Sequence, residues 1–232
     1  MVTIIVCAVI LGFTAQGGSG ITDINGIITM SMLTSLFMGM LSVVWAMDFI
    51  NAQRNNSNRE AGGGTASLLI YSAKVLQNTA VDTFLRPIIF CIVYYNIALP
   101  RAHFGDFFLV MYGTAISCSG LGYLIAVLVP PAMSTVIGLI ITFTFGGILN
   151  GFSPYLNELP SPWVAFPSYA RWAVEALSIR EFREYNDWKI DYGMSTIGYT
   201  YSNWPWCLVW LYVSGLLFRV LAFPFYRRIC LV

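Results

Sequence analysis

The chain has 232 residues, of which 57% are apolar and only 10% are charged, and its mean hydropathy is +0.70. Soluble domains carry roughly a quarter of their residues as charged side chains, so this composition excludes a soluble globular enzyme. The net charge of +1 provides no basic field for nucleic acid.

Apolar runs long enough to cross a bilayer recur along the chain. A hydrocarbon core of roughly 30 Å requires about 20 apolar residues in a helix. We therefore expect one all-α membrane domain over residues 1–232, a polytopic bundle of about six transmembrane helices, with an external loop region at 151–204. The expected spans are 2–16, 27–51, 66–98, 107–129, 132–150 and 205–226.

The first apolar run is short and starts at the initiator methionine. A signal peptide is one interpretation, but the run has no basic segment before it and no small-residue cleavage site in the right place. The sequence favours a shortened first helix, which implies a chain that begins partway into a larger protein.

The distribution of arginines predicts a cytoplasmic N-terminus. This orientation agrees with the positive-inside rule because four arginines then lie on the cytoplasmic side of the membrane: Arg54, Arg59, Arg227 and Arg228. The basic residues of segment 151–204 then lie outside, where acidic residues balance them. The sequon that begins at Asn55 would face the cytoplasm and stay unglycosylated.

The third expected helix carries a polar stripe. Its members are four residues apart, on one face of a helix: Lys74, Asn78, Asp82 and Arg86. Charge within a membrane is costly, so the stripe predicts a substrate path or a relay between helices. The alternative is that Lys74 lies at the interface and its side chain snorkels, while Asp82 and Arg86 form a structural ion pair.

Two further patterns predict packing. Thr114, Cys118 and Gly122 are small residues at four-residue spacing, which allows close helix approach. Residues 160–185 resemble a short interfacial helix that caps the outer mouth of the bundle, with an Arg171–Glu175 pair. Its aromatic residues are expected at headgroup depth: Trp163, Tyr169 and Trp172.

The sequence contains no pattern typical of hydrolytic chemistry. Lys74 and Lys189 are the only lysines, and neither lies in a Walker A loop. The single histidine, His103, has no neighbours at metal-ligand spacing. We therefore expect no catalytic residue, no metal site and no enzyme activity on this chain.

The order of short motifs resembles the G subfamily of ATP-binding cassette transporters, of the white-brown-complex half-transporter type. Residues 59–63 and 71–74 resemble its "R-E-x-x-G" and "Y-F-x-A-K" elements, and they read REAGG and YSAK here. Residues 169–177 resemble its external "Y-x-R-W-x-x-E-A" element and read YARWAVEAL, preceded by Gly146-Gly147 and the segment 160–163. The resemblance covers nearly the whole chain.

The resemblance implies an ABC-2 type exporter domain that works as a homo- or heterodimer in a lipid membrane. In that family the segment at Arg59 and Glu60 is an amphipathic coupling segment, separate from the second span, that touches a nucleotide-binding domain. That domain would bind ATP and Mg²⁺; it is absent from this chain, so it would belong to the same gene product or to a separate chain. The second and fifth helices would line a path for a hydrophobic or lipid-like substrate, with these candidate lining residues: Phe37, Trp45, Phe143 and Phe145.

An ATP-independent channel or ion-coupled carrier that uses the polar stripe is the alternative function. The internal repeats typical of many carriers are not evident in the sequence.

Overall fold

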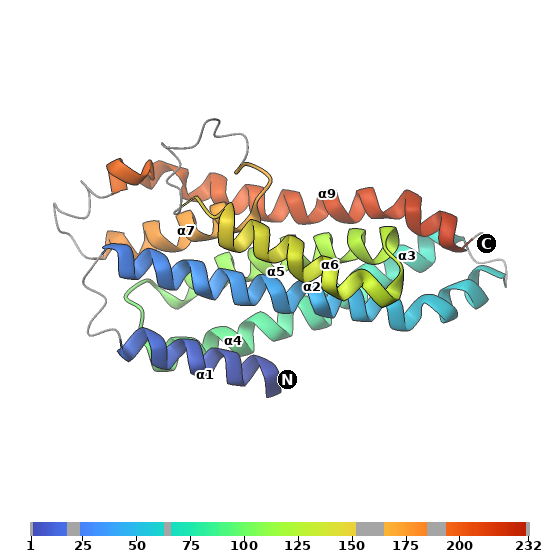
Figure 1. Ribbon diagram of the computed structural model, residues 1–232, viewed down its shortest axis with the longest axis horizontal. Helices are drawn as coiled ribbons and strands as arrows, with labels where there is room; N and C mark the ends of the chain where they lie inside the picture. The colour runs from blue at the N-terminus through green and yellow to red at the C-terminus, as the bar shows by residue number, and fades with distance from the viewer. Residues whose placement is uncertain (1, 18–23, 63–65, 152–164, 185–193, 231–232) are drawn as a thin grey trace.

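The computed structural model describes residues 2–17, 24–62, 66–151, 165–184 and 194–230, and this part of the chain is built from helices without strands (Figure 1). The elements are α1 (Val2–Gly17), α2 (Ile24–Gly62), α3 (Ser67–Gln77), the π-helix η1 (Asn78–Asp82), α4 (Thr83–Ala98), α5 (Phe104–Leu128), α6 (Pro131–Phe143), the π-helix η2 (Thr144–Ile148), α7 (Tyr169–Arg183), the short 3-10 helix η5 (Tyr201–Asn203) and α9 (Trp204–Cys230).

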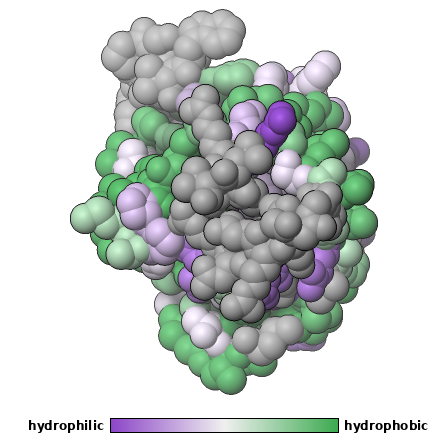
Figure 2. Space-filling model, turned by 90° about the vertical axis from the view of Figure 1, so that its right-hand side faces the viewer, coloured by the Kyte–Doolittle hydropathy of each residue, from purple (hydrophilic) through white to green (hydrophobic). Residues whose placement is uncertain are grey.

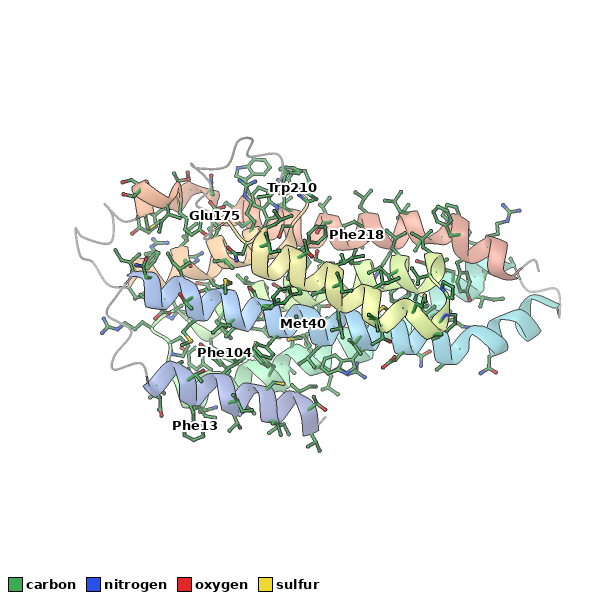
Figure 3. The ribbon with its side chains drawn as sticks, viewed as in Figure 1. Phe13, Met40, Phe104, Glu175, Trp210 and Phe218 are labelled. Atoms are coloured by element: carbon green, nitrogen blue, oxygen red, sulfur yellow. The ribbon has the colours of Figure 1, made fainter. Side chains whose placement is uncertain are left out.

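Five helical segments of the described chain are long and apolar enough to cross a membrane. They are Ile24–Gln53, Ser67–Ala98, Phe104–Leu128, Pro131–Ile148 and Tyr201–Arg227. The expected all-α membrane bundle is confirmed. The first apolar helix is shorter: α1 has 16 residues, or about 24 Å at 1.5 Å per residue. It runs beside only part of the bundle, and its Phe13 points away from the other helices (Figures 1 and 3).

Helix α5 forms the centre of the bundle and contacts α2, α4, α6, α7 and α9. Its small residues allow this. A Cβ atom on Gly120 would strike the carbonyl of Gly215 in α9, and one on Gly122 would lie 2.7 Å from the carbonyl oxygen of Val43 in α2. The close approach predicted from the small residues of this helix is confirmed.

Helix α2 continues well past its apolar part. Residues 51–61 contain neither proline nor glycine, so nothing interrupts the helix before the glycines at 62–64. With 39 residues, α2 is about 58 Å long. The polar stretch expected as a separate coupling segment is therefore a rigid extension of α2, at the end of the bundle where α9 also ends (Figure 1). Viewed toward that end, apolar side chains form much of the rim of the described surface (Figure 2).

Helix α7 lies at the opposite end of the bundle (Figure 1). The sequence predicted an interfacial helix here, but α7 packs against α2, α5 and α9, and ten of its fifteen residues are buried. The physical reason is its run of small side chains, including Ala170, Ala173 and Ala176, which permits close contact on several sides. Residues 152–164, which include Trp163, and residues 185–193 of the expected external loop lie outside the described part of the structure.

Candidate functional site: a buried polar cluster

The polar stripe lies on α3, η1 and α4, and much of it faces the interior of the helix bundle. Lys74 is 8% exposed, Asn78 is 2% exposed and Arg86 is half-buried. Asp82 ends the π-helix, and its side chain lies outside the described part of the structure. Lys74 is thus buried in the single chain, and the alternative that its side chain snorkels at the membrane interface stays a prediction.

The π-helix changes which residues are neighbours across the stripe. Its turn is widened by one residue, so the backbone N–H of Thr83 donates to the carbonyl of Asn78. Thr83 thereby joins Asn78 and Arg86 around one small cavity, which Ser42 and Ser119 also line. The cavity volume is about 10 Å³, close to the space that one water molecule requires.

Arg86 contacts an aromatic residue proposed from the sequence as lining. Its guanidinium carbon lies 4.3 Å from the ring centroid of Trp45 on α2. At this distance the ring face stabilises the cation. Trp45 therefore contributes to the polar cluster from the α2 side.

Arg219 of α9 is a charged member of this site that local spacing in the sequence did not indicate. It is 4% exposed, and its Nη2 donates to the Oγ of Ser119 at 2.5 Å. Its Nε is buried without a hydrogen-bond partner, as is Nδ2 of Asn78. The available signal was a single arginine within the apolar run 205–226, because an ionisable residue in a transmembrane helix usually faces the protein interior.

A tyrosine connects Arg219 to the stripe. The hydroxyl of Tyr123 donates to the carbonyl of Lys74 at 3.4 Å, and the guanidinium of Arg219 lies 5.9 Å from the Tyr123 ring. Tyr71 donates in turn to the carbonyl of Arg219 at 2.6 Å. We define the polar cluster as Ser42, Lys74, Asn78, Thr83, Arg86, Ser119, Tyr123 and Arg219.

Lys74 reaches toward the extension of α2. Its Nζ lies 3.5 Å from the carbonyl oxygen of Gln53, beside a cavity of about 300 Å³ that Asn56 and Gln77 also line. The polar cluster is thus connected to the part of α2 that leads to Arg59 and Glu60. Those two residues lie in the last turns of α2, and their side chains are outside the described part.

A second buried charge lies on α7, far from the polar cluster. Glu175 is 1% exposed, and its Oε1 accepts a hydrogen bond from Nδ2 of Asn203 at 3.0 Å. Burial raises the pKa of Glu175, while Asn203 and Arg171 act in the opposite direction. The guanidinium of Arg171 lies over the ring of Trp172 at 4.2 Å, and its ion pair with Glu175 stays a prediction. Figure 3 shows Glu175 at the same end of the bundle as Trp210 of α9.

The remaining candidate lining residues lie on α2, α6 and η2. Phe37 is 37% exposed and Phe143 is 53% exposed, whereas Phe145 is partly buried against the core. The structure does not bring them together with the polar cluster. Their role in a substrate path stays a prediction.

Together, the apolar helices and the buried polar cluster define a multi-pass integral membrane protein. Residues 3–229 match the ABC-2 type transporter family. The chain belongs to this family, and the resemblance seen in its motifs is confirmed. Membrane domains of this class form the permease part of ABC transporters and are not themselves catalytic.

Three relatives are similar to this chain over most of its length. The chain is 22% identical over 193 residues to a white-brown complex homologue of Arabidopsis thaliana. It is 26% identical over 201 residues to ABC transporter G family member 28 of the same plant, and 25% identical over 192 residues to G family member 25 of Oryza sativa subsp. japonica. Each alignment covers 82% of this chain but only 17–18% of the relative.

Proposed function

We propose that this chain is the membrane-spanning permease half of an ATP-driven exporter of the G subfamily. It moves a hydrophobic or lipid-like substrate as a homo- or heterodimer. ATP and Mg²⁺ bind to a nucleotide-binding domain, on the same gene product or on a separate chain. Family membership and the three relatives support the proposal.

The observation that carries the proposal is the unbroken course of α2 from Ile24 to Gly62. Such a helix transmits a displacement along its length because its backbone hydrogen bonds keep it rigid. Arg59 and Glu60 lie near one end of this helix, and Gly39 lies against Tyr169 of α7 far along it. A nucleotide-binding domain that moves the Arg59–Glu60 end would therefore displace the α7 end of the bundle.

A hydrophobic substrate agrees with the side chains on the same helices. Phe37 of α2 and Phe143 of α6 are exposed in the single chain, and α2 and α6 contact one another. Aromatic walls with few polar groups are typical of sites for apolar ligands. A second copy or a related half placed against α2 and α6 would enclose these rings.

A channel or ion-coupled carrier is the second candidate, and the burial of Lys74, Asn78 and Arg219 favours it. The cavity beside Asn78, however, has a volume of only about 10 Å³, which suits one water molecule. The polar cluster therefore supports a role in coupling between helices better than a role as a solute path.

The experiment is to change Arg59→Ala and Glu60→Ala in the chain joined to its nucleotide-binding domain and reconstituted in liposomes. We expect ATP hydrolysis to stay within about twofold of the parent, while transport per ATP falls about tenfold or more, a change of about 1.4 kcal/mol in coupling. Arg227→Ala, at the same end of the bundle on α9, is the matched control. Normal transport per ATP in both variants would contradict the proposed coupling role.

A further inference from the structure

A cavity of about 310 Å³ lies at the α7 end of the bundle, between α1, α2, α4, α5 and α7. This volume is at the lower limit of small-molecule pockets, roughly 300–1,000 Å³. The cavity shares no lining residue with the polar cluster or with the aromatic residues of the proposed substrate path.

The inner wall of the cavity is mainly apolar. It is formed by Ile27, Met30, Phe107, Val110 and Leu177. Two hydroxyls of α2 also reach the cavity, but both donate to their own helix: Ser31 to the carbonyl of Ile27 and Thr34 to that of Met30. The inner wall is therefore mainly apolar, and the two hydroxyls of α2 already donate to their own helix; Gln16 and Tyr94 complete the lining on the α1 and α4 sides.

The mouth of the cavity is charged, and its geometry is fixed by contacts between α7 and the loop before α5. Both carboxylate oxygens of Glu181 accept backbone N–H groups of this loop, from Arg101 at 2.9 Å and from Ala102 at 3.0 Å. Arg180 lies next to Asp106, with Nε and Oδ2 3.3 Å apart. Leu99 adopts φ = 48° at the turn, a conformation that is uncommon for residues other than glycine.

The charges of the mouth carry both signs in equal number. Arg101 and Arg180 are basic, and Asp106 and Glu181 are acidic. Such a mouth complements a headgroup that carries one positive and one negative charge, because an anionic headgroup would meet two carboxylates without an offsetting cation of its own. The side chains of Arg180 and Asp106 are 22% and 24% exposed, so a ligand headgroup can reach them.

The position of the cavity agrees with a lipid. Helix α4 ends at Ala98 and α5 begins at Phe104, so the mouth lies where two apolar spans leave the hydrocarbon. The apolar wall lies deeper, beside Val110 and Thr34. Headgroup-depth charges above an apolar recess match the two ends of a phospholipid.

We propose that this cavity binds one acyl chain of a zwitterionic phospholipid, whose headgroup lies among Arg101, Asp106, Arg180 and Glu181. The lipid is a resident ligand of the membrane domain. It is distinct from the transported substrate, and its binding needs no ATP.

The test is native mass spectrometry of the full chain released from nanodiscs that contain equal amounts of phosphatidylcholine and phosphatidylglycerol. The parent should retain one phosphatidylcholine per chain. Thr34→Phe fills the recess and should lower this retention about tenfold. Thr29→Phe on the same helix, outside the cavity lining, is the matched control and should retain the lipid.

A charge variant keeps the test decisive if Thr34→Phe does not fold. Asp106→Asn leaves the mouth with a net positive charge, so the retained lipid should shift toward phosphatidylglycerol. The proposal is overturned if the parent retains no lipid, or if it retains both lipids equally. It is also overturned if a folded Thr34→Phe retains as much lipid as the parent, or if Asp106→Asn leaves the preference unchanged. These readouts use no nucleotide, so they are independent of the proposed transport function.

Discussion

The burial of Arg219 within the membrane-spanning part of α9 requires an explanation, because it costs free energy. A charged side chain near the centre of a membrane helix costs at least about 2.5–3.5 kcal/mol, and Arg219 offsets part of this with a side-chain hydrogen bond to Ser119. Because its Nε has no hydrogen-bond partner, packing alone does not account for its presence. Residues that lower stability in this way are typical of functional sites.

We predict that Arg219→Leu leaves the thermal unfolding midpoint unchanged or raises it, while ATP-driven transport falls. The reason is that the substitution removes a costly charge but also the contact between α9 and Ser119 of α5. Ser119→Ala is the comparison: it leaves the guanidinium unpaired and should destabilise by about 1–3 kcal/mol. Equal losses of stability in the two variants would show that Arg219 is a structural residue. Tryptophan fluorescence during heating measures the midpoint.

Glu175 predicts a pH dependence. Burial raises its pKa in the folded state, so the folded protein binds this proton more tightly than the unfolded chain. The stability that this group contributes is present at low pH and is lost as the pH rises through the raised pKa. We expect Glu175→Gln to raise the unfolding midpoint at neutral pH and to make no difference well below the ordinary value of 4.5.

The control for this prediction is Glu184→Gln, an exposed glutamate just after the same helix, which should leave the pH profile of unfolding unchanged. A midpoint difference that is constant from acidic to neutral pH would contradict the assignment of the effect to Glu175.

Residue patterns in the sequence indicated only part of the polar cluster. Lys74, Asn78 and Arg86 were predicted from their four-residue spacing. Thr83 was not, because it faces the same cavity only through the wider turn of the π-helix. Arg219 comes from a helix more than 100 residues away, and such a contact follows from tertiary packing rather than from local spacing.

Among the elements, α5 and α9 are held together by backbone contact between glycines. We predict that Gly120→Leu destabilises the bundle by about 1–3 kcal/mol or more, since a side chain there would collide with the backbone of Gly215. Gly105→Ala, at the start of the same helix with nothing within 4 Å of the added Cβ, should be tolerated. Size-exclusion profiles and unfolding midpoints in detergent measure both. A stable Gly120→Leu would contradict the packing described for α5.

The positions of the helices could be predicted from the sequence wherever the length of an apolar run determines them. Apolar length predicted the five long spans, and Pro130 and Pro131 correctly separated α5 from α6. The second span was expected to end at residue 51, where the apolar run stops, but α2 continues to Gly62 because residues 51–61 contain no helix-breaking residue. The burial of α7 was missed because its aromatic residues are also typical of a membrane interface.

At the scale of the whole molecule, we expect the chain and a nucleotide-binding domain to have separate roles. The chain supplies helices, a buried polar cluster and a rigid α2, and a nucleotide-binding domain supplies the free energy of ATP hydrolysis. Since the chain spans less than a fifth of each relative, the activity of the complete assembly is a proposal that rests on the membrane domain.

The most direct test is ATP hydrolysis in nanodiscs, by this chain alone and after fusion to a G-subfamily nucleotide-binding domain. The account predicts no hydrolysis by the chain alone, and hydrolysis by the fusion that responds to lipid or sterol. A fusion that stays inactive, while the chain alone conducts solute across a membrane without ATP, would contradict it and favour the channel or carrier.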